Sequence, residues 1–151
     1  MRPAIRRRPR PAIGSGKDKT EPPQPTWLRP DLLPEWNLVT AGRHNVLLAG
    51  APAATDAMLV ALRPHFRKPI WRCKPKKGVP LVQPSGGTLI LLEAARLDAK
   101  QQKQLLGWFD QFDGSLQIVT TTSQPLFSLV QSGAFLEQLY YGLNVVRMDL
   151  D

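Results

Sequence analysis

The segment Gly50–Ala57 follows a short apolar run, where a phosphate-binding loop would follow the first strand of a nucleotide-binding domain. Such a loop needs glycines that let backbone N–H groups surround phosphate, and a lysine for the terminal phosphates. Here Gly50 is kept, Thr55 stands at the second glycine and Asp56 stands at the lysine. Asp56 would repel a triphosphate by roughly 4 kcal/mol per unit charge at close range. Because Pro52 also lacks an N–H donor, we predict an ordinary strand-to-helix turn.

Two basic blocks carry most of the net charge of +8. Residues 1–26 hold seven Arg or Lys against two acids, and residues 63–77 hold seven and no acid. The candidates for polyanion contact are Arg6, Arg7, Arg8, Arg67, Lys68, Arg72, Lys74, Lys76 and Lys77. Phe66 and Trp71 lie in the second block, and rings among cations can bind single-stranded nucleic acid. The alternatives are a solvated basic face with Trp71 in the core, and a solubilising arm at the N-terminus.

Composition excludes several classes of protein. No apolar run approaches the roughly 18–20 residues that span a bilayer, and the basic N-terminus lacks the apolar segment of a secretory signal. The single cysteine, Cys73, cannot form an internal disulfide, which fits a reducing cytoplasm. His44, His65 and Cys73 do not have the spacing of metal ligands. We therefore expect a cytoplasmic protein with no membrane segment and no metal site.

The elements that would position these residues alternate along the chain. Apolar runs predict strands at 45–50, 69–73, 88–93, 116–122 and 145–150, and helical spacing predicts helices at 53–66, 99–112, 125–133 and 135–143. Asp98 is the expected N-cap of the second helix, and Pro64 must bend or end the first. This alternation predicts an α/β fold of three layers, with a mainly parallel sheet of about five strands. The runs 45–50, 88–93 and 116–122 are expected near its centre.

The chain divides into three predicted parts. Residues 1–26 are rich in proline, glycine and charge and have no apolar period, so we expect a disordered basic tail. Residues 27–44 are expected to connect this tail to the core, and the apolar stretch 27–36 within them is expected to pack across it. Residues 45–151 form the predicted core.

Two stretches carry a resemblance to a known family. They read GGTLILLEAARLDAKQQKQLLGWFDQF and SLQIVTTTSQPLFSLVQSGAFLEQLYYGLNVVRMDL. This order of parts resembles the central ATPase domain of the bacterial sigma-54-dependent transcription activators, a branch of the AAA+ P-loop ATPases. That family has a Gly-Gly-Thr-Leu-Phe-Leu-Asp-Glu strand and, later, a Leu-Tyr-Tyr-Arg-Leu-Asn-Val segment. The resemblance runs from residue 45 to 150 and is strongest after residue 86. It implies a P-loop core.

The resemblance also implies that the catalytic groups are lost. The metal-binding aspartate falls at Leu92, and the two arginines that reach a neighbouring nucleotide fall at Leu136 and Gly142. The catalytic-base position keeps Glu93, and the sensor pair becomes Thr122 and Ser123. The remnant nucleotide site would thus comprise Gly50, Thr55, Glu93, Thr122 and Ser123. We predict no catalytic residue, no ATPase activity and no cofactor, with weakly bound ATP and magnesium as the alternative.

Parts outside this core also differ from the family pattern. The family's Gly-Ala-Phe-Thr-Gly-Ala loop, which touches sigma-54, is replaced by KPKKGVPLVQPS. We expect no helical lid domain, no receiver domain and no helix-turn-helix.

Three classes of function remain. The first is a non-hydrolysing regulator or adaptor in transcription regulation that binds another protein, such as an intact AAA+ activator or the transcription machinery. The second is a weak ATP-binding sensor, and the third is a basic nucleic-acid-binding protein. The retained scaffold together with the lost catalytic charges favours the first.

Overall fold

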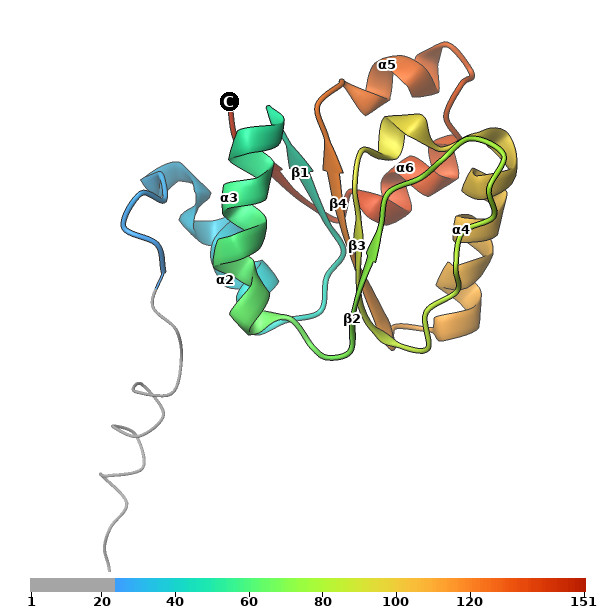
Figure 1. Ribbon diagram of the computed structural model, residues 1–151. Helices are drawn as coiled ribbons and strands as arrows, with labels where there is room; N and C mark the ends of the chain where they lie inside the picture. The colour runs from blue at the N-terminus through green and yellow to red at the C-terminus, as the bar shows by residue number, and fades with distance from the viewer. Residues whose placement is uncertain (1–23) are drawn as a thin grey trace, which may run out of the picture.

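The sheet has five parallel strands, with helices on both faces (Figure 1). The computed structural model describes residues 24–151. The strands are β1 (Val46–Ala49), β2 (Ile70–Cys73), β3 (Gly87–Leu91), β4 (Leu116–Thr122) and β5 (Val146–Asp149). Their order is β2-β3-β4-β1-β5, and every pairing is parallel. The predicted α/β class is confirmed, and the three runs expected near the centre form the interior strands.

The helices follow the predicted pattern in most places. They are η2 (Pro30–Leu32), α2 (Leu33–Ala41), α3 (Pro52–Leu62), η3 (Arg63–His65), η4 (Ala94–Arg96), α4 (Ala99–Phe112), α5 (Leu126–Gln131) and α6 (Glu137–Leu143), where η marks a 3-10 turn. Helix α3 ends before Pro64, as expected from the missing N–H of proline. Helix α4 begins with a capping box, in which Asp98 and Gln101 each accept the other's backbone N–H.

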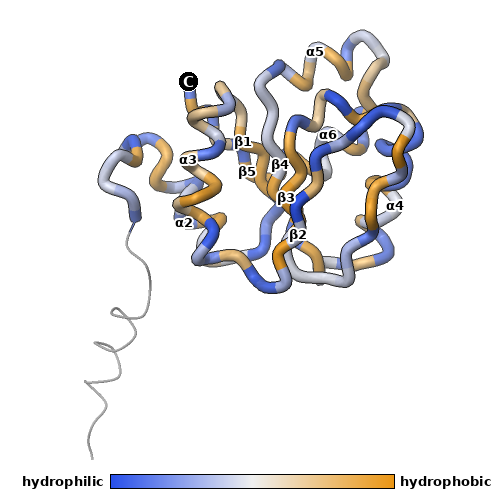
Figure 2. Tube along the Cα trace, viewed as in Figure 1, coloured by the Kyte–Doolittle hydropathy of each residue, from blue (hydrophilic) through white to orange (hydrophobic). Residues whose placement is uncertain are grey.

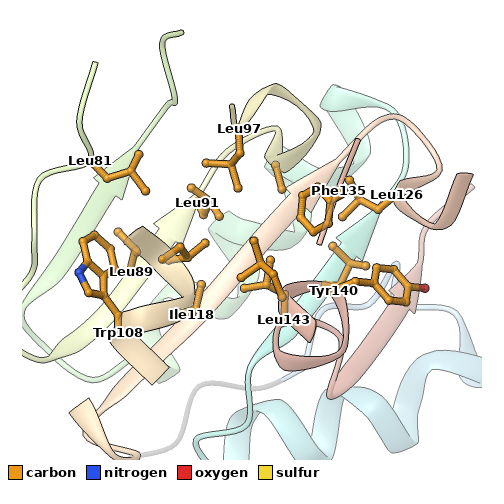
Figure 3. Packing of buried hydrophobic residues seen from close by; sticks show 14 of the residues in the cluster. Leu81, Leu89, Leu91, Leu97, Trp108, Ile118, Leu126, Phe135, Tyr140 and Leu143 are labelled. Carbon is orange, nitrogen blue, oxygen red and sulfur yellow. The ribbon is translucent and has the colours of Figure 1, made fainter. Parts of the chain in front are cut away.

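Two hydrophobic clusters, one on each face of the sheet, form the core. Strand side chains alternate between them, since Leu47 and Leu89 point to one face and Leu48 and Ile90 to the other. Helices α4, α5 and α6 cover the first face, where Figure 3 shows the packing. Helices α2 and α3 cover the second. The hydropathy colouring of Figure 2 places the most hydrophobic residues along the strands and the inner sides of the helices. The predicted three layers are therefore present.

The first described residues pack onto this core. Leu28, Leu32, Trp36 and Val39, from a segment for which the sequence predicted no helix, are buried in the second cluster. The Arg29 guanidinium donates to the backbone oxygen of Asp149 at 2.6 Å, on the side of β5 that faces away from β1. The N-terminal segment thereby covers the β5 edge of the sheet. No helix within residues 24–151 is long and apolar enough to cross a bilayer. The expected disordered tail, with Arg6, Arg7 and Arg8, lies almost wholly outside the described residues.

Candidate functional site

A cleft of about 330 Å³ lies at the carboxyl ends of β3 and β4, beside the first turn of α3. In parallel α/β sheets, ligands bind at this end of the strands. The cleft brings together Thr55, Glu93 and Ser123, three of the five predicted remnant residues. Gly50 and Thr122 instead line an adjoining cleft of about 290 Å³, which Ser123 also borders. The predicted residues thus gather at one end of the sheet but in two hollows.

The loop before α3 is engaged by the chain itself. The backbone N–H of Ala51 donates to Asp151 Oδ1 at 3.2 Å. A side chain at Gly50 would come within 3.1 Å of the Leu150 Cβ atom. The hydroxyl of Thr55 is buried and donates to the Pro52 oxygen at 3.1 Å, within the first turn of the helix. These backbone and side-chain groups therefore bind other protein atoms in the place where a phosphate cradle would need them free.

Glu93 occupies an unusual backbone position at the end of β3. Its φ of 55° lies in the left-handed region, which is rare for residues other than glycine. Its N–H donates to Thr121 Oγ1 at 3.0 Å. Its Oε1 accepts from the Ser123 N–H at 3.2 Å and from Ser123 Oγ at 2.9 Å. Backbone positions of this kind cluster at functional sites, and Glu93 is the residue that the resemblance assigns to the catalytic base.

Thr122, the first residue of the predicted sensor pair, has a local structural role. Its Oγ1 donates to the Gln124 oxygen at 2.6 Å and accepts from the Gln124 N–H at 3.2 Å. Both bonds fix the turn that leads from β4 into α5. Only Ser123 of this pair reaches Glu93.

The positive charge of the cleft comes from residues outside the segment Gly50–Ala57. Arg72 and Lys74 at the end of β2 and Arg96 of η4 line it, together with the acids Asp56 and Glu93. Arg96 was not predicted, because it lies outside the basic block in the sequence. Two positions do not fit magnesium and a triphosphate in the way the family binds them, because Leu92 has no side-chain oxygen for the metal and Asp56 is an anion where the resemblance places the lysine. Within residues 24–151 no cluster of three or more His, Cys, Asp or Glu is placed to hold a metal.

The two positions to which the resemblance assigns the family's arginines are packing positions here. Leu136 precedes α6, is partly buried, and donates its N–H to Gln102 Oε1 at 2.8 Å. The Gln102 amide also donates to the backbone oxygens of Leu97 and Ala134, at 3.1 and 3.0 Å. Gly142 lies so close to Phe109 that an added Cβ would collide with the ring. An arginine at 142 would therefore require Phe109 to move.

The second basic block surrounds β2. Lys68, Arg72, Lys74, Lys76 and Lys77 are exposed and Arg67 is half-buried. Phe66, however, lies in the core with 7% of its surface exposed. Trp71 packs against the first cluster, and its indole N–H donates to the Gly86 oxygen at 2.8 Å. Phe66 is therefore not available to stack on a base, whereas Trp71 is half-buried against the core, as in the alternative of a basic face with Trp71 turned inward.

Comparison with known proteins places this architecture in a family. The family model of the sigma-54 interaction domain matches residues 72–151 of this chain. The chain belongs to the sigma-54 interaction domain family. This sigma-54 interaction domain is 32% identical over 88 residues to the HTH-type transcriptional regulatory protein TyrR of Salmonella typhimurium and to that of Salmonella typhi. The match covers 50% of this chain but only 17% of TyrR.

Solved structures agree on the fold. NtrX from Brucella abortus in complex with ATP aligns with a TM-score of 0.68 and 17% identity, over 93% of this chain and 39% of that one. The P-loop NTPase domain of a sigma-54 transport activator from E. coli aligns with a TM-score of 0.50 and 18% identity, over 68% of this chain and 93% of that one. At such identities the likeness concerns the fold, and it confirms the predicted P-loop core for this sigma-54 interaction domain.

Proposed function

We propose that this sigma-54 interaction domain regulates transcription through contact with another protein and does not hydrolyse ATP. The observation that supports this most directly is the composition of the cleft. Asp56 stands in place of the phosphate-binding lysine and Leu92 in place of the metal-binding aspartate, while the former base Glu93 is hydrogen-bonded to Ser123. The parallel sheet and both cores are nevertheless complete. A scaffold kept without its catalytic charges is best explained by a binding role.

The related proteins suggest the setting of this role. TyrR is named as a transcriptional regulatory protein, and the family is named for interaction with sigma-54. We therefore propose an intact AAA+ activator or a component of the transcription machinery as the partner. Joined to such an activator, this chain would supply no arginine to the neighbouring nucleotide site, since Leu136 and Gly142 stand at those positions. It would then act as a spacer or an inhibitor.

A second candidate is an ATP-binding sensor without hydrolysis. Arg72, Lys74 and Arg96 favour it, because they bring three cations into the cleft. Calorimetric titration of the chain with ATP, with and without magnesium, separates the two candidates. If the wild type releases or absorbs heat on binding ATP and Arg96→Glu does not, the sensor role is supported. If the wild type shows no heat of binding, the protein-binding role remains.

The test of the first candidate is affinity capture of the tagged chain from its native host. We expect a protein partner that stays bound at about 0.5 M salt, because salt screens contacts of an apolar interface far less than phosphate contacts of a basic surface. If the only material captured is nucleic acid, and it is released at that salt, the proposed function is wrong and the nucleic-acid role replaces it.

A further inference from the structure

The two edges of the sheet differ in how they are covered. Arg29 and α2 cover the β5 edge. At the other edge, β2 pairs only with β3, through bonds such as Thr88 N–H to the Pro69 oxygen at 3.0 Å and Leu92 N–H to the Cys73 oxygen at 2.8 Å. The alternation of a strand then directs the backbone groups of Ile70 and Arg72 away from β3. Among residues 24–151, no other segment hydrogen-bonds to those groups, so β2 is an open edge.

A groove of about 360 Å³ lies beside β2, between this strand and the loop that leads to β3. The loop is hydrogen-bonded to α4 and leaves the outward backbone groups of β2 without a bond to it. Gln101 donates to the backbone oxygens of Lys76 and Val79, both at 2.7 Å. Gln104 exchanges two hydrogen bonds with the backbone of Leu81, at 2.9 and 2.7 Å. Because α4 holds the loop in place, the groove exists without a partner.

The lining of the groove has a defined chemistry. Its floor is apolar, with Trp71, Leu81 and Leu89, and Figure 3 shows the last two at the margin of the hydrophobic cluster. Its rim carries Arg72, Lys74 and Lys76, and no acidic residue lines it. Val79 and Val82 on the loop are 52% and 79% exposed. An open strand edge beside an apolar, cation-rimmed groove suits an extended segment that alternates apolar and acidic side chains.

Charge excludes two other occupants. The chain's own first 26 residues carry seven cations against two acids, so they would be repelled by the rim. A second copy would bring two cationic β2 edges together. A nucleic acid has no backbone amide groups to pair with the open strand edge and no apolar side chains for Val79 and Val82, so it would use only the cations of the rim. We infer that the β2 edge and its groove bind an extended acidic segment of another protein, which joins the sheet as a further strand. This inference rests on the proposed function and assigns the surface through which the chain would bind its partner protein.

The probe is a synthetic peptide of about eight residues, a usual strand length, that alternates valine with glutamate. A peptide of the same composition with one central proline is the control, since proline removes a strand hydrogen bond. Amide hydrogen exchange of the full chain is followed by NMR. We expect the acidic peptide to slow exchange at Ile70 and Arg72, and the proline peptide to have little effect. Binding without this protection, no binding, or protection by a single-stranded oligonucleotide instead would overturn the inference.

Charge reversal at the rim provides the second measurement. The double variant Lys76→Glu/Val82→Glu alters only the groove, and Lys103→Glu/Val60→Glu is a matched control, since Val60 is 74% exposed on α3. We expect the first variant to bind the peptide at least about tenfold more weakly and the control to bind as the wild type does. Equal affinity in the two variants contradicts the inference. If both variants capture the same partner protein from the host, the proposed function stands and only this surface is wrong.

Discussion

The carboxylate of Glu93 accepts both the backbone N–H and the hydroxyl of Ser123, at 3.2 and 2.9 Å, through the same oxygen. These residues come from the ends of β3 and β4, and the resemblance assigns them to the catalytic base and the sensor. Their contact holds the carboxylate in the cleft that Arg72, Lys74 and Arg96 also line. Glu93 and Ser123 thus form a polar link between the ends of the two strands.

The first prediction concerns this link. Phosphate release from ATP and magnesium should equal the background for the purified wild-type chain and for Glu93→Gln, because neither has a metal ligand at Leu92 or a lysine at Asp56. Colorimetric phosphate detection over several hours is sufficient. Turnover above background that disappears in Glu93→Gln would show that the cleft still hydrolyses ATP.

Local patterns predicted the interior strands and α4 well. The run at 88–93 is apolar throughout, as in a strand buried on both faces, and Asp98 marks the start of a helix with one apolar stripe. Helix α2 was not predicted. Its residue Leu38 is 49% exposed whereas Trp36 and Val39 are buried, so no clean stripe is visible. Long-range contacts with β5 stabilise this helix, and single-sequence patterns do not contain such contacts.

For the candidate site, too, the sequence predicted some residues and missed those that depend on long-range contacts. The resemblance grouped Glu93 with Ser123, and the structure places both in one cleft. It gave no indication that Arg96 lines the cleft or that Asp151 engages the Ala51 N–H, since both depend on how distant segments meet. The groove beside β2 could not be predicted either. Gln101 and Gln104, which hold the loop that borders it, have the pattern of ordinary polar residues on a surface helix.

Two glycines in helices should respond oppositely to alanine. An added Cβ at Gly142 would collide with Phe109, whereas at Gly107 it would meet nothing within 4 Å. Gly142→Ala should lower the free energy of unfolding by about 1–3 kcal/mol through overpacking. Gly107→Ala should raise it by up to about 1 kcal/mol, because alanine favours the helix. Urea unfolding followed by circular dichroism measures both. A neutral Gly142→Ala would show that Phe109 moves aside and that position 142 could accept a side chain.

Asp98 should make stability depend on pH in acid. Hydrogen bonds from the backbone N–H groups of Gly78 and Gln101 lower the pKa of this carboxyl below its usual 3.8. The ionised form is therefore favoured in the folded chain, and its contribution is complete above pH 3.8 and is lost as the pH falls through the lower folded value. The advantage of the wild type over Asp98→Asn in urea unfolding should shrink when the pH is lowered through this range. A difference that stays constant with pH would mean that the charge has no part in capping α4.

The final prediction tests where the folded unit begins. Trp36 of α2 is 4% exposed and its ring meets that of His65 edge-on at 5.4 Å, whereas Trp27 is 54% exposed. Trp36→Ala should lower the free energy of unfolding by about 3–5 kcal/mol, the usual cost of emptying a large buried site. Trp27→Ala should cost well under half of that. Deletion of residues 1–23 should leave the melting temperature almost unchanged, because their composition offers too little apolar surface to pack. Calorimetry of the three variants tests where the folded unit begins. A loss of stability in Trp36→Ala as small as that in Trp27→Ala would show that α2 is not part of the core. A large fall in melting temperature on deletion would show that the basic segment docks on the core.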